Sequence, residues 1–376
     1  MNHVLHICSD YSKQTLYREL IIELSKKGIK QTVYVPVRSL SEVGKYDIAG
    51  IENVKVIYSH ILFFKHRLLY QVKIKTIFTD IEKKVNLKNI EIVHAHFLFS
   101  DGGVAYKIKA KYSIPYIVAI RNTDVNVFFK YMLHLRAFGR EIIKASRKIV
   151  FITPAYQSLL VERYVLGKFS NRVIDASIVP NGLSPVWLEE SMFNCAQTLV
   201  PLKLLYVGDF SRNKNVIKLL KVIKNFSQRM DVELTLAGGG GNDHESLLNL
   251  LQRKEFKFAK YIGRVEGIPA MKQLYSQHHI FIMISKLETF GLVYLEAMSQ
   301  GLPVVHTAGQ GIDGYFNNSR FAIPVNPNSE KDVMNAIESI LNNYEIASRE
   351  ARKASKSFLW DEIAISYFKI YNLQLN

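Results

Sequence analysis

Apolar runs typical of buried strands alternate with amphipathic runs typical of helices along almost the whole chain. In the first half the strand-like runs lie at His3–Ile7, Gln31–Val35, Ile90–Ala95, Tyr116–Ile120, Lys148–Ile152 and Val173–Val179. Repeated strand–helix–strand order predicts a parallel sheet with helices on both faces and ligands at the carboxyl ends of the strands. The expected fold class is therefore α/β.

A second series of the same kind begins at Leu202–Gly208 and continues to Phe321–Val325. Between the two series, Pro180-Asn181-Gly182 is a strong stop signal, and an irregular stretch follows it. With 376 residues, of which 48% are hydrophobic, the chain can bury two separate cores. We predict two Rossmann-like doubly wound domains over 1–185 and 186–355, and a helical segment over 356–376.

The net charge of +16 is concentrated in the first of these domains. Residues 1–185 contain 28 Lys and Arg against 14 Asp and Glu, a net of +14, which leaves +2 for the rest of the chain. Such a field attracts nucleic acid, an anionic membrane surface or a phosphorylated substrate. Because no nucleic-acid motif, Walker loop or Gly-x-Ser-x-Gly elbow is present, we expect no nucleic-acid partner, and a nucleic-acid-binding protein is only an alternative.

Two segments, 61–75 and 127–136, mix bulky apolar residues with cations. Each could lie in a bilayer interface, or form an amphipathic helix that packs on its own domain. No apolar run reaches about 18 residues, the amino terminus begins with a strand rather than an export signal, and the chain has two cysteines. We predict a cytoplasmic protein, peripheral at the inner face of the cell membrane. The residues expected to insert are Phe63, Phe64, Leu68, Phe128 and Phe129.

Two carboxylates stand eight positions apart across one predicted strand-to-helix turn. Glu288 follows the strand-like run Ile280–Ile284, and Glu296 falls about one turn inside a predicted helix over Leu292–Gln300. The tip of such a helix favours a diphosphate. A carboxylate can accept hydrogen bonds from neighbouring hydroxyls, so Glu296 suits a ribose and Glu288 a sugar hydroxyl. Gly291 would let the backbone approach the ligand closely.

This string resembles the E-x7-E signature of glycosyltransferase family 4, whose members are retaining enzymes of the GT-B fold. The resemblance implies two Rossmann-like domains that face a cleft, with a C-terminal helix that crosses back to the first domain. It implies a glycosyltransferase that moves a sugar from a nucleoside-diphosphate sugar, with UDP-sugar as the default, to a hydroxyl of a cell-surface polysaccharide or lipid-linked glycan. A sugar-nucleotide epimerase of the same architecture is the alternative, and the oligomeric state is left open.

The resemblance also assigns residues of the second domain. Glu288 is the expected catalytic residue. The expected donor-binding residues are Lys214, Arg212, Arg264, Val265, Phe290, Gly291, Leu292 and Glu296. Asp209 stands where the family has an Arg that binds the diphosphate together with the Lys, so we assign the second cation to Arg212.

In the first domain, Val93-His94-Ala95-His96 resembles the family's His-Ala-His strand end, and Arg121-Asn122-Thr123-Asp124 its His-Gly-x-Asp turn. Arg121 replaces the His, and we expect it to stabilise charge on the leaving phosphate as a second catalytic residue. Asp10, Lys13 and Asp124 are the acceptor-side candidates. His94 and His96 are interpreted as facing opposite sides of their strand, and no Cys or His cluster accompanies them. We therefore expect neither a metal nor a cofactor.

Overall fold

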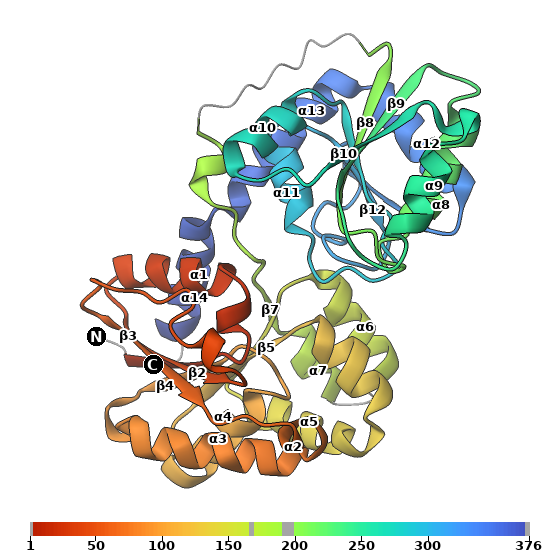
Figure 1. Cartoon of the computed structure of the whole chain (residues 1–376). Helices are drawn as coiled ribbons and strands as arrows, with labels where there is room; N and C mark the ends of the chain where they lie inside the picture. The colour runs from red at the N-terminus through yellow and green to blue at the C-terminus, as the bar shows by residue number, and fades with distance from the viewer. Residues whose placement is uncertain (1–2, 165–168, 190–198, 373–376) are drawn as a thin grey trace. The chain divides into compact units, whose positions relative to one another are not determined.

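The chain forms two compact units in the computed structural model, which describes residues 3–164, 169–189 and 199–372 (Figure 1). The first unit comprises Met1–Gly182 with Trp360–Asn376, and the second comprises Leu183–Leu359. The two divisions lie close to the positions 185 and 355 expected from the sequence. Because the chain returns to the first unit at Trp360, helix α14 (Trp360–Asn372) belongs to that unit and packs on α1 (Leu16–Lys26).

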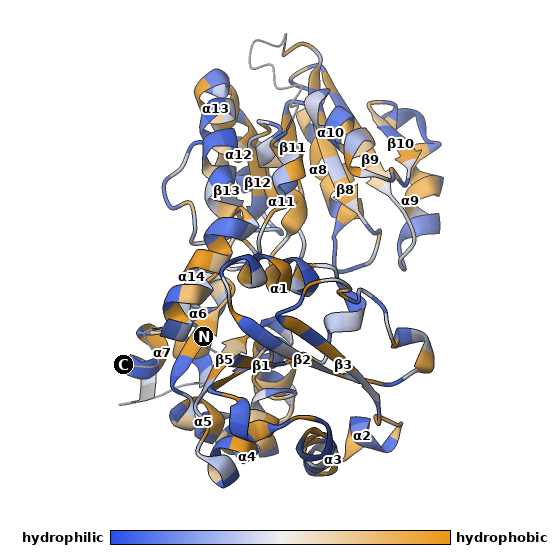
Figure 2. Cartoon of the chain, turned by 90° about the vertical axis from the view of Figure 1, so that its left-hand side faces the viewer, coloured by the Kyte–Doolittle hydropathy of each residue, from blue (hydrophilic) through white to orange (hydrophobic). Residues whose placement is uncertain are grey.

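The first unit contains a seven-stranded sheet in the order β3-β2-β1-β4-β5-β6-β7, and all its pairings are parallel. Helices cover both faces, so the central strands are buried on both sides and read as apolar runs (Figure 2). The strands are β1 (His3–Ile7), β2 (Lys30–Val37), β3 (Val54–His60), β4 (Ile92–Ala95), β5 (Tyr116–Ile120), β6 (Lys148–Phe151) and β7 (Ser177–Ile178).

Helices α1 and α14 cover one face of this sheet and α3, α4 and α5 the other (Figure 1). Besides α1 and α14, the helices of the unit are α2 (Lys65–Leu68), α3 (Tyr70–Lys84), α4 (Gly102–Tyr112), α5 (Arg136–Ala145), α6 (Pro154–Tyr164) and α7 (Phe169–Ile174). The prediction of a strand over 173–179 was wrong for its first half, because α7 ends at Ile174. Only Ser177–Ile178 pairs in the sheet.

The second unit contains a six-stranded parallel sheet in the order β10-β9-β8-β11-β12-β13. Its strands are β8 (Leu202–Gly208), β9 (Val232–Gly238), β10 (Ala259–Gly263), β11 (Ile280–Ile282), β12 (Val304–Thr307) and β13 (Ala322–Val325). Its helices are α8 (Val216–Phe226), α9 (His244–Leu251), α10 (Ile268–Ser276), α11 (Leu292–Ser299), α12 (Glu330–Leu341) and α13 (Tyr344–Ser355). Both units are thus Rossmann-like.

Each sheet has one topological switch point. In the first unit the chain leaves β1 for β2 on one side and later returns to β4 on the other, and in the second unit β8 lies between β9 and β11 in the same way. Open parallel sheets bind ligands in the crevice at such a point, beyond the carboxyl ends of the two strands. The loops after β1, β4, β8 and β11 are therefore where functional residues are expected. Among the described residues, no helix is both long and apolar enough to span a bilayer.

Candidate active site

The two loops at the switch point of the second unit are fastened to each other. Asn213, in the loop after β8, donates from Nδ2 to the carbonyl of Leu287 (2.8 Å) and accepts from the Leu287 amide at Oδ1 (3.0 Å). The amide of Lys286 donates to the Asn213 carbonyl at 2.8 Å, and Asn215 reaches the carbonyl of Ile284 at 3.3 Å. These hydrogen bonds fix the loop after β8 relative to the loop after β11.

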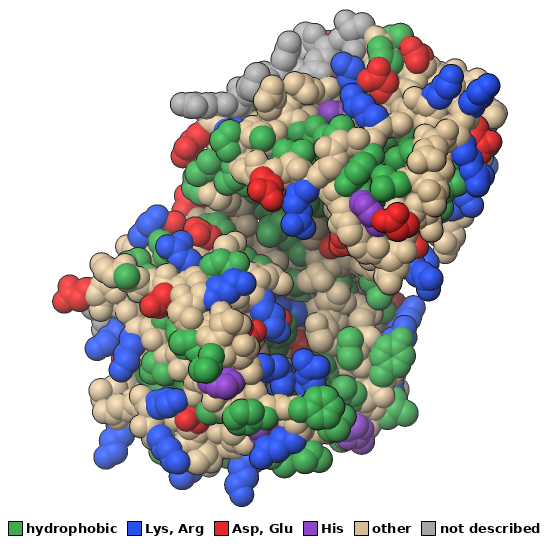
Figure 3. Space-filling model, viewed as in Figure 1, with side chains coloured by type: hydrophobic (Ala, Val, Ile, Leu, Met, Phe, Trp, Pro, Cys, Tyr) green, Lys and Arg blue, Asp and Glu red, His purple; other side chains and the backbone are tan. Residues whose placement is uncertain are grey.

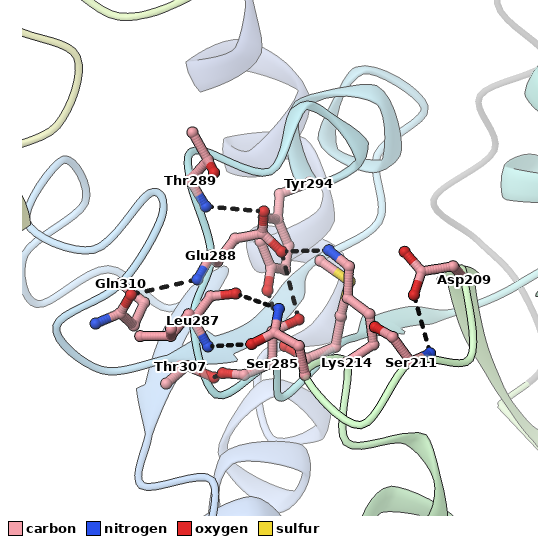
Figure 4. A network of polar contacts seen from close by, with 12 residues as sticks. Asp209, Ser211, Lys214, Ser285, Leu287, Glu288, Thr289, Tyr294, Thr307 and Gln310 are labelled. Carbon is pink, nitrogen blue, oxygen red and sulfur yellow. Dashed lines mark hydrogen bonds and ion pairs between the residues drawn. The ribbon is translucent and has the colours of Figure 1, made fainter. Parts of the chain in front are cut away.

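Lys214 and Glu288 meet across these loops (Figure 4). Lys214 Nζ lies 2.7 Å from Glu288 Oε2, and Ser285 Oγ donates to the same oxygen at 3.3 Å. The Thr289 amide donates to Oε1 at 3.1 Å, and the Glu288 amide donates to Gln310 Oε1 at 3.2 Å. With the residue 8% exposed, the carboxylate is held in one orientation. The geometry thus joins a cation and a carboxylate at the place where the fold favours a ligand.

Glu296 lies in α11, on the helix that begins just beyond the Glu288 loop. Its Oε2 accepts from Tyr275 OH at 3.2 Å. Burial disfavours the charged form and raises the pKa of Glu296 to about 7, although the hydrogen bond from Tyr275 opposes this shift. At neutral pH the group is therefore poised between the carboxylic acid and the carboxylate, and hydroxyl donors from a ligand would favour the carboxylate.

The turn that starts α11 explains two of the predicted donor residues. Gly291 has φ +82°, and a Cβ there would lie 2.4 Å from the Tyr294 ring, so the turn itself requires glycine. The ring of Phe290 is 2% exposed and packs near Tyr315 and Phe358, which makes it part of the core. A donor could meet only the backbone of Phe290. Leu292 is the first residue of the helix and is half-buried.

The other predicted donor-site cations lie apart from the Lys214–Glu288 pair. The side chain of Arg212 is 81% exposed and its Nε lies 3.8 Å from Asp243 Oδ1. Asp209 uses its carboxylate to accept the Ser211 amide at 2.9 Å, an Asx-type turn that explains an acid in this loop. Arg264, exposed, and Val265, half-buried, follow β10, which is the edge strand and is separated from β8 by β9.

The four-glycine loop after β9 is explained by close packing of two backbones. A Cβ on Gly238 would lie 1.9 Å from the Gly208 carbonyl oxygen, and one on Gly241 would lie 2.5 Å from the backbone of Phe210. The Phe210 amide donates to the Gly240 carbonyl at 2.9 Å. The loop after β9 therefore packs closely on the loop that carries Lys214. These contacts are sufficient to require glycine at positions 238 and 241.

In the first unit, Arg121 is buried and immobilised, with 5% of its surface exposed. Its Nε donates to the His96 carbonyl at 2.9 Å and its Nη1 to Asn181 Oδ1 at 3.3 Å. Its guanidinium lies 5.1 Å from the ring centre of Tyr17 and 5.5 Å from that of Phe97. Aromatic faces stabilise the buried cation.

Asp124 is buried and holds two loops together. It is 1% exposed, and its carboxylate accepts the amides of Leu98 (3.1 Å), Phe99 (3.1 Å) and Arg121 (3.0 Å). It ties the loop after β4 to the loop after β5, and its acceptor-side role stays a prediction. Asp10 and Lys13 do lie at the switch point of the first unit, in the segment after β1, and they form an ion pair at 2.5 Å.

The prediction that His94 and His96 face opposite sides was wrong, because residues two apart on a strand face the same side. Their ring centres are 4.0 Å apart, and His6 Nδ1 lies 3.1 Å from His96 Nε2. Ligand nitrogens of His6, His94 and His96 lie within 4.8 Å of one another. Burial lowers the pKa of all three imidazoles, that of His6 to about 3, so they are neutral at physiological pH.

Neutral imidazoles are competent metal ligands, and residues 3–164, 169–189 and 199–372 contain no other group of three potential ligands. His94 Nδ1 pairs with Tyr371 OH at 2.8 Å, in addition to the His6–His96 contact. Within the part of the chain that the structure describes, His6 Nε2, His94 Nε2 and His96 Nδ1 are buried without a hydrogen-bond partner. Since no acidic residue belongs to the cluster, a divalent ion there would be buried without a compensating charge, which is costly, although three imidazoles alone do hold zinc in some enzymes. Metal independence stays a prediction.

Residues 196–357 match the sequence model of the family described as glycosyl transferases group 1. An uncharacterised glycosyltransferase of Methanocaldococcus jannaschii is 24% identical over 177 residues, which cover 46% of this chain and 45% of that protein. The O-antigen chain mannosyltransferase B of Escherichia coli is 29% identical over 178 residues, 45% of each chain. The matched segment thus spans about half the length of these relatives. Over this segment the chain is similar to proteins named as glycosyltransferases.

Two solved structures resemble the chain over its full length. The lipopolysaccharide outer core galactosyltransferase WaaB in its apo form has a TM-score of 0.75 at 15% identity and covers 100% of both chains. The Anabaena protein HepE in complex with UDP has a TM-score of 0.72 at 13% identity and covers 99% of this chain and 100% of that one. Together with the two parallel sheets, these likenesses identify the architecture as GT-B.

Proposed function

We propose that this chain is a retaining glycosyltransferase of family 4 that transfers a sugar from a UDP-sugar to a hydroxyl of a cell-surface polysaccharide or lipid-linked glycan. The observation that carries the proposal is the Lys214–Glu288 pair, 2.7 Å apart at the switch point of the second unit, with Glu296 on the helix that follows. The UDP bound by HepE supports the choice of donor, and the O-antigen chain in the name of the mannosyltransferase supports the acceptor class.

In the proposed reaction each residue has one task. The Lys214 ammonium offsets negative charge on the donor diphosphate, and the Glu288 carboxylate accepts a hydrogen bond from a hydroxyl of the donor sugar. Glu296 accepts hydrogen bonds from the ribose. The departing phosphate assists deprotonation of the acceptor hydroxyl, so the transfer needs no separate carboxylate base, and retention follows from attack on the face that the phosphate leaves. We keep Arg121 as the cation for charge on the leaving phosphate.

The test separates binding from transfer. Glu288→Gln should lower kcat by more than about 100-fold, because an interaction made in the transition state is weakened, while the donor Kd changes little. Glu296→Ala should mainly raise the donor Kd. Glu350→Gln, an exposed glutamate on α13, is the matched control and should change neither. Small and equal effects of Glu288→Gln and Glu296→Ala on transfer would remove the assignment.

The epimerase alternative predicts a different product. An epimerase would convert the nucleotide sugar into a free epimer when no acceptor is present. Incubation with the donor alone, followed by chromatography of the nucleotide sugars, separates the two activities. We expect unchanged donor, with at most slow hydrolysis to the nucleoside diphosphate and free sugar.

We further propose that the first unit binds peripherally to an anionic membrane surface. Phe63, Phe64 and Leu68 are 54%, 72% and 74% exposed, as insertion requires. Phe129 is wholly buried and its predicted insertion was wrong, and Phe128 stacks on the buried Phe99 at 4.6 Å. The attraction would come from exposed cations beside this segment, each worth on the order of 1 kcal/mol near an anionic surface.

Vesicle co-sedimentation tests the membrane proposal. Binding should require anionic lipid, weaken with salt, and fall in the triple variant K65E/R67E/K75E. Lys73 is left intact because it is buried. The variant K30E/K83E/K88E changes three exposed lysines of the same unit by the same charge and should bind more tightly than the first variant. Equal binding to neutral and anionic vesicles, or binding to neither, would contradict the proposal.

A further inference from the structure

The first unit has a pocket at its own switch point. The pocket measures about 320 Å³, at the lower end of the range for small-molecule sites. Ser9 and Lys13 line it from the segment after β1, and Ser100 from the segment after β4. Arg38 and Lys73 close it from the segment after β2 and from α3. The fold thus gives the first unit a ligand site of the same kind as the one in the second unit.

Lys73 is the most informative residue of this pocket, because a lysine that is 9% exposed needs a reason to be buried. The hydrogen bond of its ammonium goes to a hydroxyl, Ser100 Oγ at 3.0 Å, rather than to a carboxylate. Burial lowers the pKa of Lys73; the nearby Asp101 opposes this shift, and Arg38 adds to it by repulsion. An anion in the pocket would add to the attraction from Asp101 and so favour the charged ammonium.

The acids in and beside the pocket each have a partner in the protein. Asp10 pairs with Lys13 at 2.5 Å, and Glu42 Oε2 accepts the backbone amide of Arg38 at 2.8 Å. Asp101 is fully buried and accepts hydrogen bonds from the amide and hydroxyl of Ser9. Burial raises the pKa of Asp101 to about 7, so it carries only part of a charge at neutral pH. The pocket is lined by three cations (Lys13, Arg38 and Lys73) and by two carboxylates (Asp10 and Glu42), so the lining side chains carry a formal charge of +1, which favours an anion.

Large apolar side chains lie exposed at the edge of the pocket. They are Phe63, Phe64, Leu68, Leu69 and Val72, exposed by 54%, 72%, 74%, 52% and 39% respectively, and we call them the apolar rim. In the short helix α2, His66 is the buried residue, and its Nδ1 accepts a hydrogen bond from the Phe63 amide at 2.9 Å. Because His66 occupies the buried side of the helix, the neighbouring apolar side chains are exposed to solvent.

The apolar rim and the pocket are continuous. Arg38 Nη1 donates to the Phe63 carbonyl at 3.2 Å, and Leu62 lines the pocket. Figure 3 shows Lys and Arg side chains gathered in a hollow of this unit, with hydrophobic side chains beside them. A cationic pocket that opens onto exposed apolar surface complements a molecule with an anionic head and a hydrocarbon chain.

We propose that this pocket binds the phosphate-bearing head of an amphiphilic acceptor whose hydrocarbon chain lies on the apolar rim. The inference rests on the proposed function, and it narrows the acceptor to a lipid-linked phosphate rather than a free polysaccharide. Lys73 and Arg38 contact the phosphate, and the rim covers the first part of the chain. The hydroxyl to be glycosylated belongs to the same head group.

The test uses dodecyl phosphate below its micelle concentration, measured by isothermal titration calorimetry on the full chain. Lys73→Met should weaken binding by at least tenfold, because a buried charge-assisted hydrogen bond is lost. Lys83→Met removes an exposed lysine from the same helix and should change the Kd less than twofold. Arg38→Gln, at a partly exposed position, should weaken binding severalfold, and it keeps the test valid if Lys73→Met fails to fold.

A second comparison separates the head from the chain. The double variant Phe64→Ser/Leu68→Ser should lower the affinity for dodecyl phosphate several-fold. It should leave the affinity for inorganic phosphate unchanged. Ile174→Ser, at an exposed apolar position on α7, is the matched control. Dodecyl maltoside, which has the same chain but no charge, should bind at least tenfold more weakly than dodecyl phosphate. Equal affinity for the two amphiphiles, or equal effects of Lys73→Met and Lys83→Met, would overturn the proposal.

Failure of this inference is distinguishable from failure of the proposed function. UDP binding is measured on the same protein and depends on Lys214 in the second unit. If UDP binds and dodecyl phosphate does not, the acceptor inference fails alone. If UDP does not bind, the proposed function fails, whatever dodecyl phosphate does.

Discussion

Replacing Glu296 by Gln should change how the stability of the second unit depends on pH. The pKa of Glu296 is about 7 in the folded chain, against an ordinary value of 4.5. Because the folded state holds this proton more tightly than the unfolded state does, the carboxyl group favours folding below pH 4.5, and that contribution is lost as pH rises through 7. At about 1.36 kcal/mol per unit of pKa difference, the loss is about 3 kcal/mol above pH 7.5.

Gln cannot ionise, so Glu296→Gln should gain about 2 to 3 kcal/mol of unfolding free energy over wild type between pH 5 and pH 8. The assay is urea unfolding at pH 5, 6, 7 and 8. Trp187 is the suitable probe because it is 7% exposed and its ring centre lies 5.9 Å from that of Tyr275, beside the site. The chain has two tryptophans, and a Trp360→Phe background leaves Trp187 as the reporter.

Two further variants show whether the effect belongs to this carboxyl group. Tyr275→Phe removes the hydrogen bond that stabilises the carboxylate, so it should move the midpoint of the pH dependence upward. Glu350→Gln, at an exposed position, should leave the pH dependence unchanged. If wild type and Glu296→Gln lose or gain stability in parallel from pH 5 to pH 8, the reasoning about the buried carboxyl group is refuted.

Three other predictions concern packing and buried charge. The first unit should lose stability as pH falls from 6.5 toward 3, because folding depresses the pKa of His6 to about 3 and the unfolded chain takes up the proton first; His6→Asn should make this fall in the urea-unfolding free energy shallower, and the buried His94 and His96 account for part of what remains. Asp124→Ala should lower the unfolding free energy by about 2 to 4 kcal/mol, since three buried amides lose their acceptor, whereas Asp10→Ala should cost under about 1 kcal/mol. Gly238→Ala should lower the melting temperature far more than Gly240→Ala, because a Cβ at Gly238 would collide with the Gly208 carbonyl and one at Gly240 would meet nothing within 4 Å.

The parts of the fold that depend on local pattern could be predicted from the sequence. Central strands such as β5 and β11 are buried on both faces, so they are continuous apolar runs. The edge strand β3 (Val54–His60) was not singled out, because it is largely half-buried and carries Lys55 and Ser59 within it. Strand β7 (Ser177–Ile178) is only two residues long. A sequence pattern of two residues cannot be distinguished from the end of the preceding helix.

The candidate site was predictable where it is local and unpredictable where the fold assembles it. Glu288 and Glu296 are placed by one strand, one turn and one helix, all of which have sequence signals. Lys73 and Arg38 come from separate segments, and a lysine on α3 has the same sequence pattern whether it faces solvent or a pocket. Attention to the strand ends that flank β1 would have identified Ser100.

The most direct test of the central claim is nucleoside-diphosphate binding to a matched pair of variants. UDP, GDP and ADP are titrated by calorimetry into Glu288→Gln and into Lys214→Met/Glu288→Gln, so that the pair differs only in the ammonium and no buried carboxylate is left unpaired. We predict that UDP binds Glu288→Gln and that loss of the ammonium weakens it by at least tenfold. If none of the three nucleotides binds, or if both variants bind UDP equally well, the loop that carries Lys214 is not the donor site.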